Sequence, residues 1–207
     1  MFVKICGITN ELDARFAIEA GADAVGLILA ESPRRVDPET ARRIVGSLPE
    51  DALTVAVFRG GDPERVLRAF RTIGAKAMQI HDPSPDGLAH LRERVPFLIE
   101  AVAAEDDVHE RAERTTADLF LVVAAEPGSG RPFDWSLLDP APRRVRLVLA
   151  GGLTPDNVAG AVQRVEPWGV DVSSGVEVEP GRKDHRKVRL FVERARAAQA
   201  PTTAAER

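Results

Sequence analysis

The chain has 207 residues, of which 44% are hydrophobic and 29% are charged, and its formal net charge is −4. This composition is typical of a globular domain with a substantial core, and it disfavours intrinsic disorder and phosphate-driven binding of nucleic acid. Cys6 is the only cysteine, which excludes an internal disulfide, and no apolar run is long enough to span a bilayer. We therefore expect a cytoplasmic protein with neither a nucleic-acid partner nor a membrane partner.

Short apolar segments alternate with amphipathic ones along the chain. The predicted strands cover 2–6, 24–29, 53–58, 77–80, 97–102, 119–123, 145–149 and 170–172. The predicted helices cover 12–20, 38–45, 63–73, 85–95, 154–165 and 183–198. Asp37 before Pro38 and Thr154 before Pro155 are typical of an N-cap followed by a first-turn proline.

The rhythm of these segments, roughly 25 residues per strand–helix unit, predicts a parallel α/β array. Eight such units can close into a (β/α)8 TIM barrel, and an open doubly wound sheet is the alternative. The polar and Gly-rich segments that follow most strands favour the barrel, because they would gather at one face of it. We expect one barrel domain over residues 1–198 and a flexible C-terminal tail over 199–207.

Cys6 ends the first predicted strand, within Lys4-Ile-Cys-Gly-Ile-Thr9. The carboxyl ends of barrel strands form the face that carries active sites. A thiol in that position can act as a base or a nucleophile when its pKa is lowered. The alternative interpretation is a small buried hydrophobic residue, which is common for a free cysteine.

Two late segments have the composition of phosphate-binding loops. Gly151 and Gly152 follow the seventh predicted strand, and Ser173, Ser174 and Gly175 follow the eighth. In many barrels these two loops bind a phosphate, because small residues let the backbone approach an anion. Tight turns and helix caps would explain either segment alone, so the argument rests on the pair.

Other polar residues also fall at strand ends. Arg34 follows the second predicted strand and could hold a carboxylate through two hydrogen bonds. Gln79 and His81 lie two apart on the fourth strand, so their side chains share a face and could both enter the mouth. The histidines and Cys6 do not have the spacing of a zinc site, so we expect no metal.

Taken in order, these segments resemble the phosphoribosylanthranilate isomerase family of tryptophan biosynthesis. The resemblance runs from Val3 to about Val192 and is carried by Lys4-Ile-Cys-Gly-Ile-Thr9, Gly21-Ala-Asp-Ala-Val-Gly26, Ser32-Pro-Arg34, Gln79-Ile-His81, Gly128-Ser-Gly130, Phe133-Asp-Trp135, Gly151-Gly-Leu153, Asp171-Val-Ser-Ser-Gly-Val-Glu177 and Gly181-Arg-Lys-Asp184. It implies a (β/α)8 barrel that needs no cofactor. It also implies an Amadori rearrangement of N-(5-phosphoribosyl)anthranilate to 1-(2-carboxyphenylamino)-1-deoxyribulose 5-phosphate.

The resemblance further implies roles for individual residues. Cys6 would be the general base that removes the C2 proton. Lys4, two residues earlier on the same strand face, would favour its thiolate and contact the substrate. Arg34 would bind the anthranilate carboxylate, and Asp171 would face the sugar. Gln79 and His81 would contact the substrate. The phosphate would bind Gly151, Gly152, Ser173, Ser174 and Gly175. The partner would be a small phosphorylated aminosugar, and the protein a monomer or homodimer.

Two positions depart from the family pattern. The family's general acid is an Asp at the end of strand six, and counting back ten residues from Phe133 reaches Val123 instead. Glu126, three residues later, could supply the proton, or ring opening could proceed without a protein acid. Glu100 stands near the end of strand five, where the family often carries Lys, and would change the charge of the mouth.

These departures leave two further functions open. One is a paralogue from a specialised pathway that acts on a related phosphoribosyl-arylamine. The other is a non-catalytic protein that binds a phosphosugar.

Overall fold

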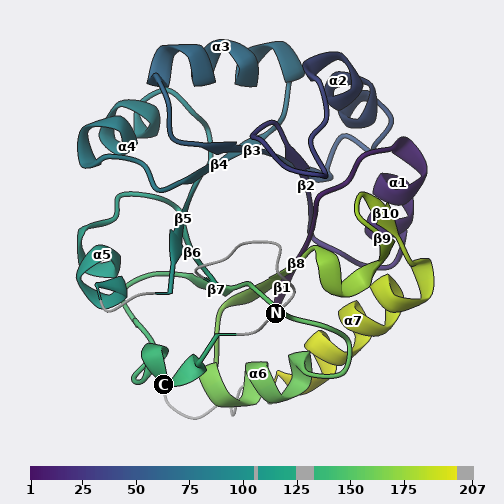
Figure 1. The fold of residues 1–207 in the computed structure, drawn as a ribbon, viewed down its shortest axis with the longest axis vertical. Helices are drawn as coiled ribbons and strands as arrows, with labels where there is room; N and C mark the ends of the chain where they lie inside the picture. Colours follow the sequence, from purple (N-terminus) through teal and green to yellow (C-terminus); the bar gives the residue numbers. More distant parts are fainter. Residues whose placement is uncertain (105–106, 125–132, 200–207) are drawn as a thin grey trace.

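The computed structural model describes residues 1–104, 107–124 and 133–199 and contains a closed barrel of eight parallel strands (Figure 1). The barrel strands are β1 (Phe2–Cys6), β2 (Ala24–Ile28), β3 (Leu53–Arg59), β4 (Ala77–His81), β5 (Leu98–Ala103), β6 (Leu119–Val123), β7 (Leu147–Leu149) and β8 (Gly169–Val172). Each strand pairs with the next in sequence, and β1 closes the ring by pairing with β8. The expected (β/α)8 barrel is confirmed, and the open sheet is excluded.

Helices surround the strands on the outside of the ring (Figure 1). They are α1 (Glu11–Glu19), α2 (Pro38–Gly46), α3 (Pro63–Ile73), α4 (Pro85–Arg92), α5 (Val108–Arg114), α6 (Val158–Val165) and α7 (His185–Ala198), with short 3-10 helices η1 (Trp135–Leu138) and η2 (Ser174–Val176). A small antiparallel pair, β9 (Glu177–Glu179) and β10 (Arg182–Lys183), precedes α7. Helix α7 packs between α6 and α1, so the last helix sits beside the first.

The structure confirms one predicted helix cap, corrects another and adds a helix. The Asp37 cap is confirmed, since its carboxylate accepts from the backbone N–H groups of Glu39 and Thr40. Thr154 is not the N-cap of α6, because the Asn157 side chain folds the intervening turn by accepting from Thr154 N–H. Helix α5 was not predicted from the sequence.

Alternating side chains divide the strands into an inner and an outer layer. The inner layer is built largely from small and aliphatic residues, among them Ala24, Val55, Ala77, Ile99, Ala101, Leu119, Leu121 and Val148. The outer layer, which includes the fully buried Phe120, packs against the buried faces of the helices, among them Phe191 of α7. The side chains that reach the mouth of the barrel are therefore the inward-facing ones at the carboxyl ends of the strands.

Glu100 belongs to the outer layer, which corrects the expectation that it alters the mouth. Its strand neighbours Ile99 and Ala101 face inward, so Glu100 points toward α5 and contacts Arg111 at 3.3 Å. In the described part of the chain, no helix is long and apolar enough to cross a membrane.

Helix α7 fixes the C-terminal side of the barrel through one buried face. Val188, Phe191, Val192 and Ala195 recur at helical spacing and are buried, while the neighbouring Leu190 is 40% exposed. We expect Phe191→Ala to lower the free energy of unfolding by about 3–5 kcal/mol, because it leaves a cavity in the outer layer. Leu190→Ala should change it by less than about 0.5 kcal/mol. Urea denaturation measures both, and equal losses would contradict this assignment of the helix face.

Candidate active site

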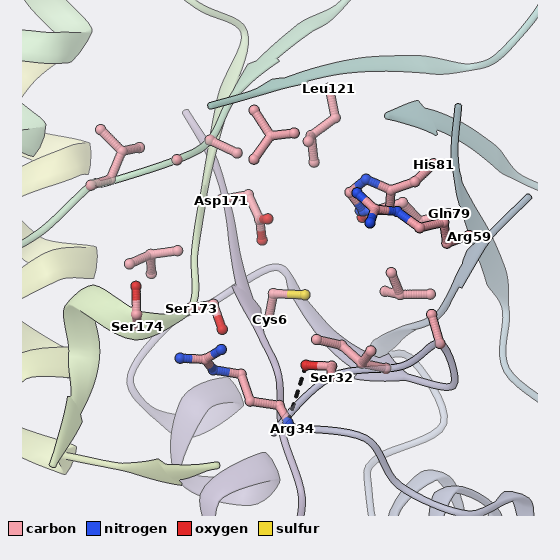
Figure 2. A pocket seen from close by; sticks show the side chains of 18 of the residues that line it. Cys6, Ser32, Arg34, Arg59, Gln79, His81, Leu121, Asp171, Ser173 and Ser174 are labelled. Carbon is pink, nitrogen blue, oxygen red and sulfur yellow. Dashed lines mark hydrogen bonds between the residues drawn. The ribbon is translucent and has the colours of Figure 1, made fainter. Parts of the chain in front are cut away.

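A pocket opens at the carboxyl ends of the barrel strands. Its walls include the expected residues Cys6, Arg34, Gln79, His81, Gly151, Gly152, Asp171, Ser173 and Ser174, together with Glu31, Ser32, Arg59, Leu121 and Val123. Figure 2 shows the Cys6 sulfur directed toward the centre, with His81 on one side and Ser173 and Ser174 on the other. The fold thus brings together residues from strand ends that lie far apart in the sequence.

A buried ion pair lies beside the thiol. Lys4 Nζ donates to Asp171 Oδ1 at 2.8 Å, and the Lys4 side chain is completely inaccessible to solvent. The pair joins neighbouring strands, since Lys4 and Asp171 are register partners on β1 and β8. Lys4 does not line the pocket and is completely buried. The expected direct contact between Lys4 and the substrate is therefore corrected: Lys4 lies beneath the site and supports it.

Burial and the neighbouring charges both shift the pKa values of Cys6 and Lys4. Burial raises the pKa of the Cys6 thiol, the Lys4 ammonium opposes this effect, and Asp171 adds to it, so the net pKa is raised. Burial acts to lower the pKa of Lys4, but Asp171 and Cys6 outweigh it, so the pKa of Lys4 is raised and its charge is retained. At neutral pH the site therefore holds a protonated thiol next to a lysine that keeps its charge.

Gly26 on β2 makes this arrangement sterically possible. A Cβ atom added at Gly26 would lie 2.8 Å from Cys6 Sγ and 3.1 Å from Lys4 Nζ. Real Cβ atoms essentially never approach a neighbour as closely as the first distance. The Gly21–Gly26 motif therefore contributes space for the thiol and ammonium rather than a functional group.

Arg34 is held by a second buried ion cluster. Its Nε and Nη2 donate to the carboxylate of Glu177 at 2.8–3.1 Å, and Lys183 Nζ donates to the same carboxylate at 2.7 Å. Burial acts to raise the pKa of Glu177, but Arg34 and Lys183 outweigh it, so that pKa is lowered. Arg34 lines the pocket, but two of its nitrogens are already bound, so Nη1 is the one left to meet a ligand.

The segment 181–184 orients this cluster. Gly181 N–H donates to Glu177 Oε1, and Lys183 N–H donates to Asp13 on α1. Asp184 then caps α7 by accepting from the N–H groups of Arg186 and Lys187. The motif Gly181–Asp184 therefore supports the Arg34–Glu177 cluster from behind the pocket wall.

The loops after β7 and β8 meet where a phosphate was expected. Gly151 and Gly152 adopt positive φ of 85° and 64°, and a Cβ at Gly151 would lie 2.5 Å from the Ala124 nitrogen. Ser173 Oγ is buried and has no hydrogen-bond partner among the described residues, which leaves it free for a ligand. Gly175 does not line the pocket. A Cβ there would lie 1.9 Å from the Leu153 carbonyl oxygen, so Gly175 lets the two loops pack together.

Strands β3 and β4 supply a third group of polar residues. Gln79 Nε2 lies 2.9 Å from His81 Nε2, and Gln79 Oε1 is buried without a partner among the described residues. Burial, with the charges of Lys4 and Arg59, lowers the pKa of His81 to about 4. Arg59 was not predicted as a pocket residue, because the predicted apolar strand ended one residue earlier, at Phe58. It is the register partner of His81, and its position two residues after the inward-facing Val57 could have signalled its direction.

The end of β6 contributes no acid to the pocket wall. Val123 lines the pocket and is 8% exposed. Glu126 lies outside the described residues. Within the described ranges, no group of three His, Cys, Asp or Glu side chains could hold a metal ion.

Comparison with known proteins gives concordant matches. Residues 3–194 match the family model described as N-(5'-phosphoribosyl)anthranilate isomerase. A curated relative of that name from Thermotoga maritima is 43% identical over 201 residues, covering 94% of this chain and 98% of the relative.

Two solved structures are similar over nearly the whole chain. Monomers generated from the dimeric Thermotoga maritima phosphoribosylanthranilate isomerase match with a TM-score of 0.86 and 37% identity, covering 95% of this chain and 99% of that one. A phosphoribosylanthranilate isomerase in complex with reduced 1-(o-carboxyphenylamino)-1-deoxyribulose 5-phosphate matches with a TM-score of 0.84 and 39% identity over the same shares.

Opposite substitutions in the buried ion pair should move the thiol pKa in opposite directions. Lys4→Met removes the cation that favours the thiolate, so the pKa of Cys6 should rise further; Asp171→Asn removes a nearby negative charge, so it should fall. The pH dependence of iodoacetamide alkylation reports this pKa, because Cys6 is the sole cysteine. Lys76→Met, on the exposed surface, is the control and should change nothing. Shifts of the same sign in both variants would contradict the assigned electrostatics.

Proposed function

The chain belongs to the N-(5'-phosphoribosyl)anthranilate isomerase family, and from that premise we propose how its pocket performs the reaction. The protein is an isomerase of tryptophan biosynthesis that carries out the Amadori rearrangement of N-(5-phosphoribosyl)anthranilate. The observation that carries the proposal is the position of Cys6, whose thiol faces the pocket beside a fully buried lysine.

The reaction needs a base at C2 of the sugar once the furanose has opened. Cys6 Sγ takes that proton, and the Lys4 ammonium beside it stabilises the thiolate that must form first. Asp171 lines the pocket while bound to Lys4, so its free oxygen can accept from a sugar hydroxyl. Losing the C2 proton converts the Schiff base into an enolamine, which tautomerises to the product.

Fixed positive charge matches the two anionic ends of the substrate. Arg34 offers Nη1 to the anthranilate carboxylate, and Glu177 holds the guanidinium so that little side-chain freedom is lost on binding. Gly151, Gly152, Ser173 and Ser174 form the phosphate site, with Gly175 supporting it through the loop contact. Gln79 and His81 contact the sugar from β4.

The proton donor for ring opening is the group that the sequence leaves unsettled. Glu126 stays the donor that the sequence predicts. A thiolate base requires a reducing compartment, which agrees with the cytoplasmic location that we propose. We also keep the monomer or homodimer as the expected assembly, since a similar enzyme from Thermotoga maritima is described as dimeric.

Replacing the base should lower turnover strongly while leaving binding intact. We expect Cys6→Ser to lower kcat by about 10²- to 10⁴-fold, because the alcohol is a far weaker base than the thiolate. The decay of anthranilate fluorescence with freshly made substrate measures turnover, and a reduced product analogue measures affinity, which should change by less than about threefold. Unchanged turnover would remove Cys6 from the mechanism. Wild-type protein that binds the analogue without turnover would favour the non-catalytic alternative.

A negative charge in the phosphate site should weaken substrate binding selectively. We expect Ser174→Asp to raise KM by at least about 30-fold with little change in kcat, since a carboxylate there repels the phosphate. Ser47→Asp is the matched control, because Ser47 follows α2 at the opposite end of the barrel. Steady-state kinetics gives both constants. An unchanged KM in Ser174→Asp would place the phosphate elsewhere.

A further inference from the structure

Ring opening requires a proton at the ring oxygen, which Cys6, the base at C2, does not supply. The ring oxygen and C2 are the two ring neighbours of C1, so a base at C2 and a donor at the ring oxygen approach from different sides. Cys6 ends β1, and the strands farthest from β1 around the closed barrel are β4, β5 and β6. A proton donor on the opposite wall must therefore come from those strands or from the loops that follow them.

That wall is almost entirely apolar. The inward side chains near its rim are Ala101 and Ala103 on β5, and Leu121 and Val123 on β6. On β4 they are Gln79 and His81. Among the described residues of these three strands, His81 is the only inward-facing group at the rim with a proton that it can transfer.

Contacts within the pocket orient the His81 ring. Gln79 Nε2 lies 2.9 Å from His81 Nε2, and an amide NH2 group can only donate. With the amide in this orientation, the ring nitrogen accepts and the neutral ring is assigned its proton on Nδ1. Gln79 is buried to 2% exposure, and its Oε1 has no partner among the described residues. The pair therefore has one oriented donor, the Nδ1–H, and one unused acceptor.

We propose that His81 donates the proton that opens the ribose ring, with Gln79 as the positioning residue that fixes its tautomer. This inference rests on the proposed isomerase function. The arylamine nitrogen lone pair forms the C1=N bond, the C1–O bond breaks, and its electron pair goes to the ring oxygen. That oxygen takes the Nδ1 proton, and the imidazolate that remains recovers a proton from water.

The charges around the ring favour this direction of transfer. Burial, Lys4 and Arg59 lower the pKa of His81 to about 4, so the ring is neutral at physiological pH. The same positive field stabilises a ring that has lost a proton, which makes the neutral imidazole a better donor. Arg59, the register partner of His81, also supports negative charge developing on the ring oxygen.

Reductive trapping isolates the ring-opening step. In a Cys6→Ser background the reaction stops at the open-chain iminium, which cyanoborohydride reduces to a stable amine that mass spectrometry counts. We expect Cys6→Ser to form this amine at least about tenfold faster than buffer, whereas adding His81→Asn or His81→Gln should remove about nine-tenths or more of that acceleration. Adding His90→Asn, the same exchange at a partly exposed histidine on α4, should leave it intact.

Circular dichroism and thermal melting confirm that each variant is folded, and the two replacements at position 81 guard against a single damaged protein. Equal trapping with and without His81 would overturn the proposal. So would loss of trapping in Glu126→Gln but not in the His81 variants, or a Cys6→Ser rate no faster than buffer. Normal isomer formation by Cys6→Ser would instead refute the role given to Cys6, so the two failures are distinguishable.

Discussion

A single ion pair in the barrel interior, Lys4 with Asp171, constrains the whole pocket. Removing two charges from water is costly unless each finds a close partner, and here the 2.8 Å contact and the inaccessible lysine satisfy that condition. The pair can form only where β1 and β8 meet, which requires the barrel to close. It therefore links the stability of the closed ring to the placement of charge beside Cys6.

The same pair has opposite effects on the neighbouring groups. Its cation offsets part of the burial that raises the pKa of Cys6, and it also suppresses the protonated form of His81. One buried charge thus biases the base toward its thiolate and the histidine toward its neutral form. The second cluster, Arg34 with Glu177 and Lys183, leaves a net positive charge near the loops expected to hold an anion.

Much of this could be predicted from the order of residues. The alternation of side chains along a strand predicted that Gln79 and His81 share a face. Cys6, Gly151 and Ser173 were predicted at the mouth because they lie at or just after strand ends. Arg59 was missed because a single arginine after an apolar run reads equally well as the start of a solvated loop. Glu100 was misplaced because its direction depends on the phase of alternation, which a short strand does not fix without its neighbours.

The sequence by itself determined the barrel, the family and most of the residues at the mouth, because these depend on local periodicity and on the order of motifs. The tertiary structure decided which charges are paired. Lys4 and Asp171 are 167 residues apart, and Arg34 and Glu177 are 143 apart. Neither pairing has a local signature, since each arises only when the ring closes in one register. That closure turned Lys4 from an expected substrate contact into a buried support, and it placed His81 on the wall where β6 offers no acid.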